Sequence, residues 1–334
     1  STQALRGILT YAPEDLYVTV GAGAPLLELQ KELARDGMWV PLLSPWHAAT
    51  VGGIVATNSN APLRMRYGGV RDLVLAVTAV LPNGRVIHAG RPVVKNVAGY
   101  DLPKLFVGSH GTLGLISDVT FKISARPRAV ATLVVPLDDL ERGLRYGSHL
   151  LRASLVASAI LLCHGCDVPG ISTPYVLVYT VEGLNEDVAA ELAEARQALQ
   201  AEGVTGWSQI ELAGSELWAT WLDAASLAET TMRVGVAPKD LPRVLSDLAS
   251  TLSRTSFMAD LGNGQLYLRD LQEIESIRQS ARALGGYAVV LNASAALLHG
   301  INAWNYTPDA FDLMRALKAR WDARGLLNPG AFIV

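Results

Sequence analysis

The stretch VVKNVAGYDLPKLFVGSHGTLGLI, residues 93–116, decides how the rest of this sequence is interpreted. It places Gly99, Gly108, Gly111 and Gly114 close together among apolar residues. Each glycine would weaken the interior of an ordinary strand or helix, because it loses more backbone freedom on folding than other residues and has no side chain to pack. These glycines must therefore serve something other than regular secondary structure.

The composition sets the broad class of the protein. The chain has 334 residues, of which 50% are hydrophobic, and a formal net charge of −3. This length predicts two domains with separate cores, and the scattered Lys and Arg residues give no broad basic surface for nucleic acid. No uninterrupted apolar run reaches the length of about 18 residues that a membrane span needs. The first residues lack the pattern of a secretory signal, so we expect a cytoplasmic protein, with peripheral attachment to the inner membrane left open.

Residues 16–62 begin as a strand, LYVTV, followed by GAGAP and by an amphipathic helix that Gly37 ends. Gly21 and Gly23 resemble the start of a nicotinamide-dinucleotide fingerprint, but Leu26 holds the place of its third glycine, so the match is weak. The next segment, LSPWHAATVGGIVATNSNAP (43–62), predicts an irregular connection with one short apolar piece at 53–56. A connection of this length usually carries function.

Residues 72–128 predict a hairpin around Pro82-Asn83-Gly84, the glycine-rich stretch, and a strand over 115–124. Arg126-Pro127-Arg128 breaks this pattern, and we place a domain boundary near residue 128. The remainder has a β-α-β-β-α order that predicts an antiparallel sheet with helices on one side. A last helix is expected to begin at the N-cap Thr307 and to stop at Gly325.

The two cysteines, Cys163 and Cys166, form a C-x-x-C pattern. A zinc site would need a second ligand pair at similar spacing, and a haem attachment would need histidine directly after Cys166. Neither is present, so a redox pair and two small apolar residues at a strand end remain as alternatives.

Several motifs together carry a resemblance to a known family. They are Thr50-Val51-Gly52-Gly53, Ala56-Thr57-Asn58, Arg66-Tyr67-Gly68, Arg71-Asp72, KNVAGYD, GSHGTLGLI and Asn328-Pro329-Gly330. With them, the chain resembles the vanillyl-alcohol-oxidase type of FAD-linked oxidases with a PCMH-type FAD-binding domain, and within it the E-subunit group of bacterial glycolate oxidases. The resemblance is strongest over residues 40–127.

The resemblance implies an α+β fold in which 1–128 form the FAD-binding domain. Residues 129–334 would form a ferredoxin-like cap domain, with 307–334 returning to the FAD domain. Its cofactor would be FAD, and the glycines are then explained by a main chain that lies against the cofactor. Carried onto this sequence, the residues along flavin and phosphates are Pro45, Thr50, Gly52, Gly53, Thr57 and Asn58, and those near ribose and adenine are Gly111, Gly114 and Ile116. The family's pyrophosphate loop would precede residue 1, so we expect this chain alone to bind FAD less tightly.

The implied activity is oxidation of a 2-hydroxy acid such as glycolate, or electron relay, in a complex with a larger flavin subunit and an iron–sulfur subunit. Relatives that oxidise D-2-hydroxy acids hold a divalent metal with histidine-containing elements. The matching stretches here, FMADLGNGQLYL (257–268) and GGYAVVLNAS (285–294), contain no histidine, so we expect no metal site and assign no catalytic residue. A flavin-free assembly subunit is one alternative. An independent oxidase is another, for which Arg233, Tyr267 and Arg269 are the residues to test.

Overall fold

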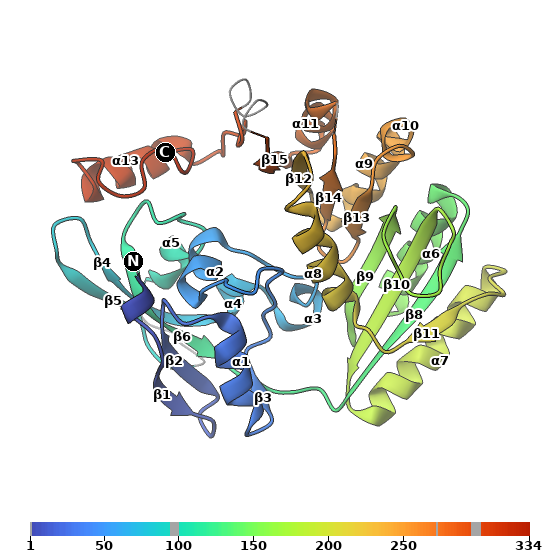
Figure 1. Ribbon diagram of the computed structural model, residues 1–334, viewed down its shortest axis with the longest axis horizontal. Helices are drawn as coiled ribbons and strands as arrows, with labels where there is room; N and C mark the ends of the chain where they lie inside the picture. The colour runs from blue at the N-terminus through green and yellow to red at the C-terminus, as the bar shows by residue number, and fades with distance from the viewer. Residues whose placement is uncertain (1, 94–99, 272, 295–301) are drawn as a thin grey trace. The chain divides into compact units, whose positions relative to one another are not determined.

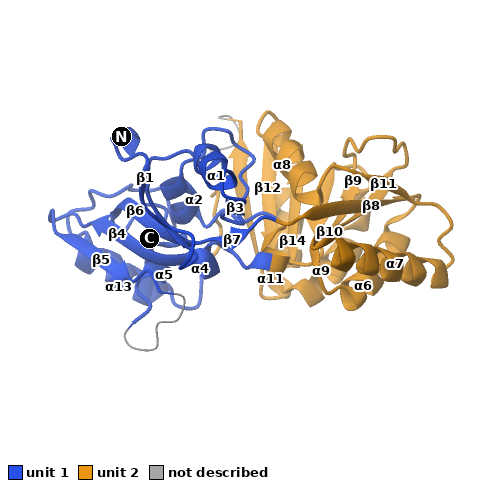
Figure 2. Ribbon diagram, turned by 90° about the horizontal axis from the view of Figure 1, so that it is seen from below, with its two compact units in different colours: residues 1–61, 67–126, 307–334 blue, residues 62–66, 127–306 orange. Residues whose placement is uncertain are grey.

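The structure is a computed structural model that describes residues 2–93, 100–271, 273–294 and 302–334. The described chain folds into two compact units, shown in Figure 2. The first contains residues 1–61, 67–126 and 307–334, and the second contains 62–66 and 127–306. Within the described ranges, no helix combines the length and the apolarity that crossing a lipid bilayer requires.

The first unit is built on an antiparallel five-stranded sheet in the order β1-β2-β6-β4-β5. In β2 the alternation places the buried Val18 and Val20 on one face of the strand, and that face packs against the helices as part of one core. Gly84 takes a positive φ of 80° in the turn between β4 and β5, as the Asn-Gly pair predicts. The strands are β1 (Ile8–Ala12), β2 (Tyr17–Gly21), β4 (Val74–Val80), β5 (Val86–Gly90), β6 (Leu115–Lys122) and the small pair β3 (Met38–Trp39) and β7 (Ser124–Ala125).

The segment 43–62, expected to be irregular, contains a helix, α2 (Val51–Thr57). Thr50 is its N-cap, and the Thr50 hydroxyl accepts a hydrogen bond from the Gly53 N–H at 3.2 Å. The fully buried Val51 and Val55 and the nearly buried Ile54 anchor one face in the core, which offsets the low helix propensity of two glycines. The other helical segments of this unit are η1 (Thr2–Ala4), α1 (Leu26–Ala34), α4 (Val70–Leu73), α5 (Pro103–Phe106) and α13 (Phe311–Trp321); α3 (Arg64–Tyr67) spans the division between the units.

The second unit consists of two β-α-β-β-α-β repeats joined edge to edge into one eight-stranded antiparallel sheet. The strand order is β11-β8-β10-β9-β13-β14-β12-β15, so each repeat has the order 4-1-3-2 of a ferredoxin-like unit and the two meet at β9 and β13. The strands are β8 (Ala129–Leu137), β9 (Ala157–His164), β10 (Tyr175–Gly183), β11 (Ser208–Ile210), β12 (Thr230–Gly235), β13 (Phe257–Asp260), β14 (Gln265–Arg269) and β15 (Tyr287–Ala293).

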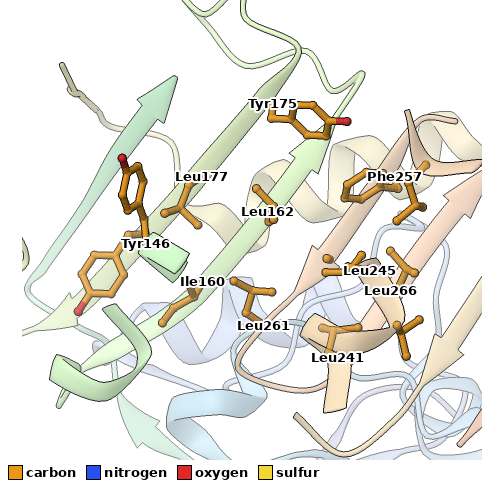
Figure 3. Packing of buried hydrophobic residues seen from close by; sticks show 14 of the residues in the cluster. Tyr146, Ile160, Leu162, Tyr175, Leu177, Leu241, Leu245, Phe257, Leu261 and Leu266 are labelled. Carbon is orange, nitrogen blue, oxygen red and sulfur yellow. The ribbon is translucent and has the colours of Figure 1, made fainter. Parts of the chain in front are cut away.

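Helices cover both faces of this sheet, which corrects the expectation of helices on one side only. One face packs on α6 (Leu140–Ala153), α7 (Asn185–Ala201), α9 (Leu241–Asp247) and α11 (Ile274–Ala283) around a core that Figure 3 shows at Leu162, Leu177 and Leu266. The other face carries α8 (Gly214–Ala225), seen on the opposite side in Figures 1 and 2. Gly214 approaches the side chains of Thr180, Ala159 and Val178, which lie on the face away from the main core. The short segments are α10 (Ala249–Leu252) and η2 (Pro238–Asp240).

The last helix begins later than the sequence predicts. α13 starts at Phe311 rather than after Thr307, because residues 308–310 form a turn in which the Phe311 N–H donates to the Pro308 carbonyl at 3.1 Å. The helix ends at Trp321 because Asp322 leaves the helical conformation with φ −128° and ψ 57°. Gly325, at φ +61°, therefore serves the turn that follows rather than the helix end.

The short segment 62–66, which includes the first three residues of α3, belongs to the second unit and not to the first. The Asn263 amide, in the turn between β13 and β14, donates to the Pro62 carbonyl at 3.1 Å and to Asp260 Oδ2 at 2.8 Å. A Cβ on Gly262 would lie 2.4 Å from the Met65 sulfur, so a side chain there would have to displace the Met65 side chain. The Asn263 amide therefore links residues 62–66 to the buried carboxylate of Asp260, a residue that is 3% exposed.

Asp260 gives the stability of the second unit a pH dependence. Burial raises its pKa to about 7, against the opposing hydrogen bonds from Asn263 and Gly262 and the charge of Arg64. The unfolded chain ionises this group near its ordinary value of about 4, so its stabilising contribution is present below pH 4 and is lost as the pH rises towards 7. We expect Asp260→Asn to flatten the pH dependence of the unfolding temperature between about pH 4 and 7. The exposed Asp223→Asn variant, melted in the same buffers, should keep the wild-type slope.

Candidate functional site

The residues predicted to lie along flavin and phosphates gather around α2 in the first unit. Pro45 is buried ahead of the helix, and Thr50 caps it. The Gly52 N–H donates to the Ala22 carbonyl at 2.8 Å, and a Cβ on Gly52 would lie 2.7 Å from the Ala22 Cβ. Gly52 is therefore required by close packing against the loop after β2.

Gly53 differs from its neighbour. It is exposed, and a Cβ there would meet within 4 Å only the Thr50 hydroxyl, at 3.2 Å. Thr57, one turn further along the same side, is also exposed and donates from its hydroxyl to the Gly53 carbonyl at 2.8 Å. Asn58 ends the helix in the left-handed conformation with φ 50°. The solvent-facing side of α2 thus presents a strip of small and polar groups.

The glycine-rich turn 108–114 joins the C-terminal end of α2. The Gly108 N–H donates to the Val55 carbonyl at 3.0 Å, and the His110 N–H donates to the Ala56 carbonyl at 2.8 Å. Gly108 and Gly111 have positive φ values of 77° and 71°, which favour glycine. Two stretches about fifty residues apart in the sequence therefore form one continuous surface.

Gly114 and Ile116 lie deeper than this surface. A Cβ on Gly114 would lie 3.1 Å from a Phe106 ring carbon and 3.3 Å from the Val80 carbonyl, so packing explains this glycine. Ile116 is 6% exposed in β6, opposite Ala79. Its side chain belongs to the core, which leaves its backbone as the part that the resemblance places near adenine.

The C-terminal tail lies against the same turn. The Asn328 amide donates to the His110 carbonyl at 2.6 Å, and the Phe332 ring stacks on the His110 ring with centroids 4.7 Å apart. The nearest atom to a Cβ built on Gly111 is the Asn328 amide nitrogen, at 3.6 Å. Our site prediction did not include this contribution of the tail, although the Asn-Pro-Gly motif signals it.

Lys318 and Asp322 fasten the tail. The Lys318 ammonium donates to the carbonyls of Thr112 at 2.8 Å and Leu327 at 2.9 Å, and it pairs with Asp322 at 2.6 Å. The Asp322 carboxylate also accepts from the N–H groups of Leu326 and Leu327. Burial alone would raise the Asp322 pKa, but these hydrogen bonds hold it at about 2. The Asp322 carboxylate therefore stays ionised at neutral pH.

The predicted glycines thus divide into two kinds. Gly52 and Gly114 are explained by packing inside the protein, whereas Gly53 and Gly111 lie at the surface. At Gly53, the Thr50 hydroxyl is the one group of the described residues within 4 Å of the position that a Cβ would take. The polar side chains in this region are Thr57, Asn58 and Asn328, which bond to the Gly53 carbonyl, the Asn60 amide and the His110 carbonyl respectively. The first N–H groups of α2 do not face outward as donors: Val51, Gly52 and Gly53 bond to Ala24, Ala22 and Thr50.

The division predicts opposite effects of two adjacent substitutions. Gly52→Ala forces a Cβ against the Ala22 backbone, and we expect it to lower the free energy of unfolding by about 2 kcal/mol. Gly53→Ala adds a methyl group at an exposed helical position and should be neutral or stabilising by up to about 1 kcal/mol. Denaturant unfolding of the two variants checks this; equal losses would contradict the assignment of Gly52 to packing.

The residues considered for an independent oxidase lie in the second unit. Arg233 on β12 pairs across the sheet with Tyr267 on β14, and its guanidinium lies 5.7 Å from the centre of the Tyr287 ring. Tyr267 is 5% exposed, and burial raises its pKa to about 12. Arg269 instead lies over the Trp221 ring of α8. In the described ranges, no group of three or more His, Cys, Asp and Glu side chains is placed to hold a metal ion.

Part of the quoted glycine-rich stretch lies outside the described residues. Lys95, Asn96 and Gly99 of the KNVAGYD motif belong to this part.

Comparison with known proteins gives the family. The FAD binding domain family matches residues 1–90, and the C-terminal domain family of the FAD linked oxidases matches residues 301–332. The chain is 30% identical, over 97% of its length and 84% of the relative, to glycolate oxidase subunit GlcE of Escherichia coli strain K12. The chain therefore belongs to the FAD-linked oxidases of the vanillyl-alcohol-oxidase type. FAD is its cofactor by this assignment, and the expected α+β fold with a PCMH-type domain is confirmed.

Other relatives agree with this assignment. Glycolate oxidase subunit GlcD of Bacillus subtilis strain 168 is 27% identical over 98% of this chain and 77% of the relative. A probable mitochondrial D-lactate dehydrogenase of Danio rerio is 24% identical over 99% of this chain and 74% of the relative. Among solved structures, an alkyldihydroxyacetonephosphate synthase has a TM-score of 0.67 at 16% identity, and the chain covers 66% of its length. That likeness concerns the fold alone.

Proposed function

We propose that this chain is the FAD-binding subunit of a glycolate oxidase type of complex, which oxidises a 2-hydroxy acid such as glycolate to the 2-oxo acid. The observation that carries the proposal is the joining of α2, the turn 108–112 and the C-terminal tail into one surface in the first unit. Relatives that cover most of the chain include proteins named for glycolate oxidase and D-lactate dehydrogenase, and glycolate and D-lactate are both 2-hydroxy acids.

In this proposal the chain positions its cofactor rather than reacting itself. FAD, when bound, supplies the two-electron chemistry. Gly53 and Gly111 leave room for it, while Thr57, Asn58 and Asn328 provide polar groups at the rim of the surface. The Lys318–Asp322 pair keeps the tail in place. The domain assignment follows: the first unit binds the cofactor, and the second unit is the cap.

A relay or supporting role fits the chain better than direct oxidation. Oxidation of a 2-hydroxy acid needs a group that takes the hydroxyl proton, and histidine is the side chain best suited to this near neutral pH. The turn that contains Asp260 and Asn263 has no histidine, and neither has β15. The partners proposed are accordingly a larger flavin subunit that carries the missing groups and an iron–sulfur subunit.

The experiment is anaerobic bleaching of bound flavin by glycolate, with and without a GlcD-type partner subunit. The relay role predicts little bleaching of the chain alone and rapid bleaching in the reconstituted complex. Rapid bleaching of the chain alone, abolished by Arg233→Met, would instead support an independent oxidase. Arg233 is the cation to test, because a guanidinium binds carboxylates well.

A flavin-free assembly subunit is a second candidate, and one observation favours it. The first three N–H groups of α2 are bonded within the protein, so they are not available to a phosphate in this conformation. This candidate predicts that the complex forms with the chain and that its flavin content equals that of the partner subunit alone.

A further inference from the structure

The C-x-x-C segment at the end of β9 has no part in the proposed cofactor surface. Cys163 is the last but one residue of the strand, is 1% exposed and lies opposite Met258. His164 and the exposed Gly165 follow, and Gly165 turns the chain with a φ of +63°. Cys166 is half-buried just beyond this turn. One thiol is therefore inside the sheet, and the other lies just beyond the end of β9.

The turn brings the two sulfurs together. The Cys166 thiol donates to the Phe257 carbonyl at 3.3 Å, on the strand that pairs with β9. It also lies in hydrogen-bond contact with the Cys163 thiol, and that contact, together with burial, raises the pKa of Cys163 well above its ordinary value. A C-x-x-C pair at a tight turn can be joined by an S–S bond when its two Cα atoms lie within about 7 Å of each other.

The surroundings hold the turn in this conformation. The Gly165 carbonyl accepts from the Ser256 hydroxyl at 2.9 Å and from the Arg269 guanidinium at 3.4 Å. His164 donates from Nδ1 to the Thr255 carbonyl at 2.9 Å, because a carbonyl can only accept. The imidazole is thus tied to the neighbouring loop, which is unlike a metal ligand between two cysteines.

We propose that Cys163 and Cys166 form a reversible intramolecular disulfide when the protein meets a peroxide. The outer Cys166 thiolate attacks one peroxide oxygen, and the O–O bond breaks to give a sulfenic acid and water. The Cys163 sulfur then attacks the Cys166 sulfur, and the S–O bond breaks with loss of a second water. Overall, two thiols give up two electrons and two protons, and one hydrogen peroxide is reduced to two waters.

The order of the two steps follows from exposure and pKa. Cys166 is half-buried and so the more exposed of the two, whereas the buried Cys163 has a raised pKa and is a poor thiolate on its own. Because Cys163 lies next to Cys166, it can act as the resolving thiol, which attacks the sulfenic acid formed at Cys166 rather than the peroxide. A reductant such as dithiothreitol should reverse the reaction.

The test uses the whole chain and one peptide. Trypsin cleaves after Arg152 and Arg196 with no Lys or Arg between them, so both cysteines lie in one peptide, 153–196. After treatment with hydrogen peroxide and blocking with an alkylating reagent, we expect this peptide to carry no alkyl group and to be lighter than the reduced form by two hydrogen atoms. Dithiothreitol before blocking should restore two alkyl groups.

Two variants complete the test. Cys163→Ala leaves the outer thiol without a partner, and we expect a sulfenic acid at Cys166 that dimedone traps, with no disulfide. Cys166→Ala should leave Cys163 reduced under the same treatment. The proposal is overturned if the wild-type peptide shows Cys166 sulfinic acid beside a free Cys163, if both thiols stay reduced, or if the oxidised protein is a disulfide-linked dimer.

Discussion

Replacing Glu191 with alanine is expected to lower the free energy of unfolding of the second unit by about 4 kcal/mol. Glu191 lies on α7 and is 7% exposed. Its carboxylate accepts from the N–H groups of Leu155 at 3.1 Å and Val156 at 2.7 Å, and from the hydroxyls of Ser154 at 3.1 Å and Tyr179 at 2.6 Å. Alanine leaves these donors inside the protein without their acceptor, and each such group costs about 1–3 kcal/mol.

Denaturant unfolding followed by circular dichroism measures this effect. The matched control is Glu194→Ala, an exposed glutamate on the same helix, which should change the free energy by less than about 0.5 kcal/mol. A loss below about 1 kcal/mol for Glu191→Ala would mean that water replaces the carboxylate, and the role given to Glu191 would be wrong.

Asp322→Ala is expected to release the C-terminal tail from the turn 108–112 and to cost about 3 kcal/mol. The substitution leaves the Lys318 ammonium, only 15% exposed in its side chain, without its counter-ion. It also removes the acceptor for the N–H groups of Leu326 and Leu327. Because Asn328 follows directly and holds the His110 carbonyl, loss of this anchor should loosen the surface proposed for FAD.

Two readouts separate stability from binding. Hydrogen exchange of residues 326–332 should rise in Asp322→Ala, and FAD affinity should fall by about tenfold, corresponding to about 1.4 kcal/mol. Asp312→Ala, an exposed change in the first turn of α13, should leave both unchanged. Unchanged exchange of the tail in Asp322→Ala would contradict the anchoring role.

Local patterns in the sequence were sufficient for most elements of the fold. The alternation in LYVTV, the Asn-Gly turn of the β4–β5 hairpin and the strand expected over 115–124 all appear in the structure where the patterns predict them. The helix at 51–57 was missed because its two glycines argue against it, and the tertiary packing of Val51 and Val55 that offsets them has no local signal. The start of α13 was misplaced because Thr307-Pro308 has the signature of an N-cap and yet forms a separate turn.

Long-range contacts were beyond sequence reasoning. Nothing local in PLRMR shows that residues 62–66 belong to the second unit, where Asn263 and Met65 contacts hold them. The same limit applies to the candidate site. The glycines were identified, but the resemblance could not separate Gly52 from Gly53. A Cβ on Gly52 would clash with Ala22, whereas a Cβ on Gly53 would meet, in the part of the chain that the structure describes, only the Thr50 hydroxyl. The contact of Asn328 with His110 spans 218 residues and has no local signal apart from its motif.

The central claim is that the first unit binds FAD on the surface formed by α2, the turn 108–112 and the tail. An equilibrium titration of flavin fluorescence tests this claim most directly. We predict saturable quenching by the wild-type chain and at least tenfold weaker binding by Gly53→Val, whose side chain enters the proposed surface. Gly206→Val, at an exposed loop glycine with no neighbour within 4 Å, should bind as the wild type does. Absence of saturable quenching, or equal affinity of all three proteins, would contradict the claim.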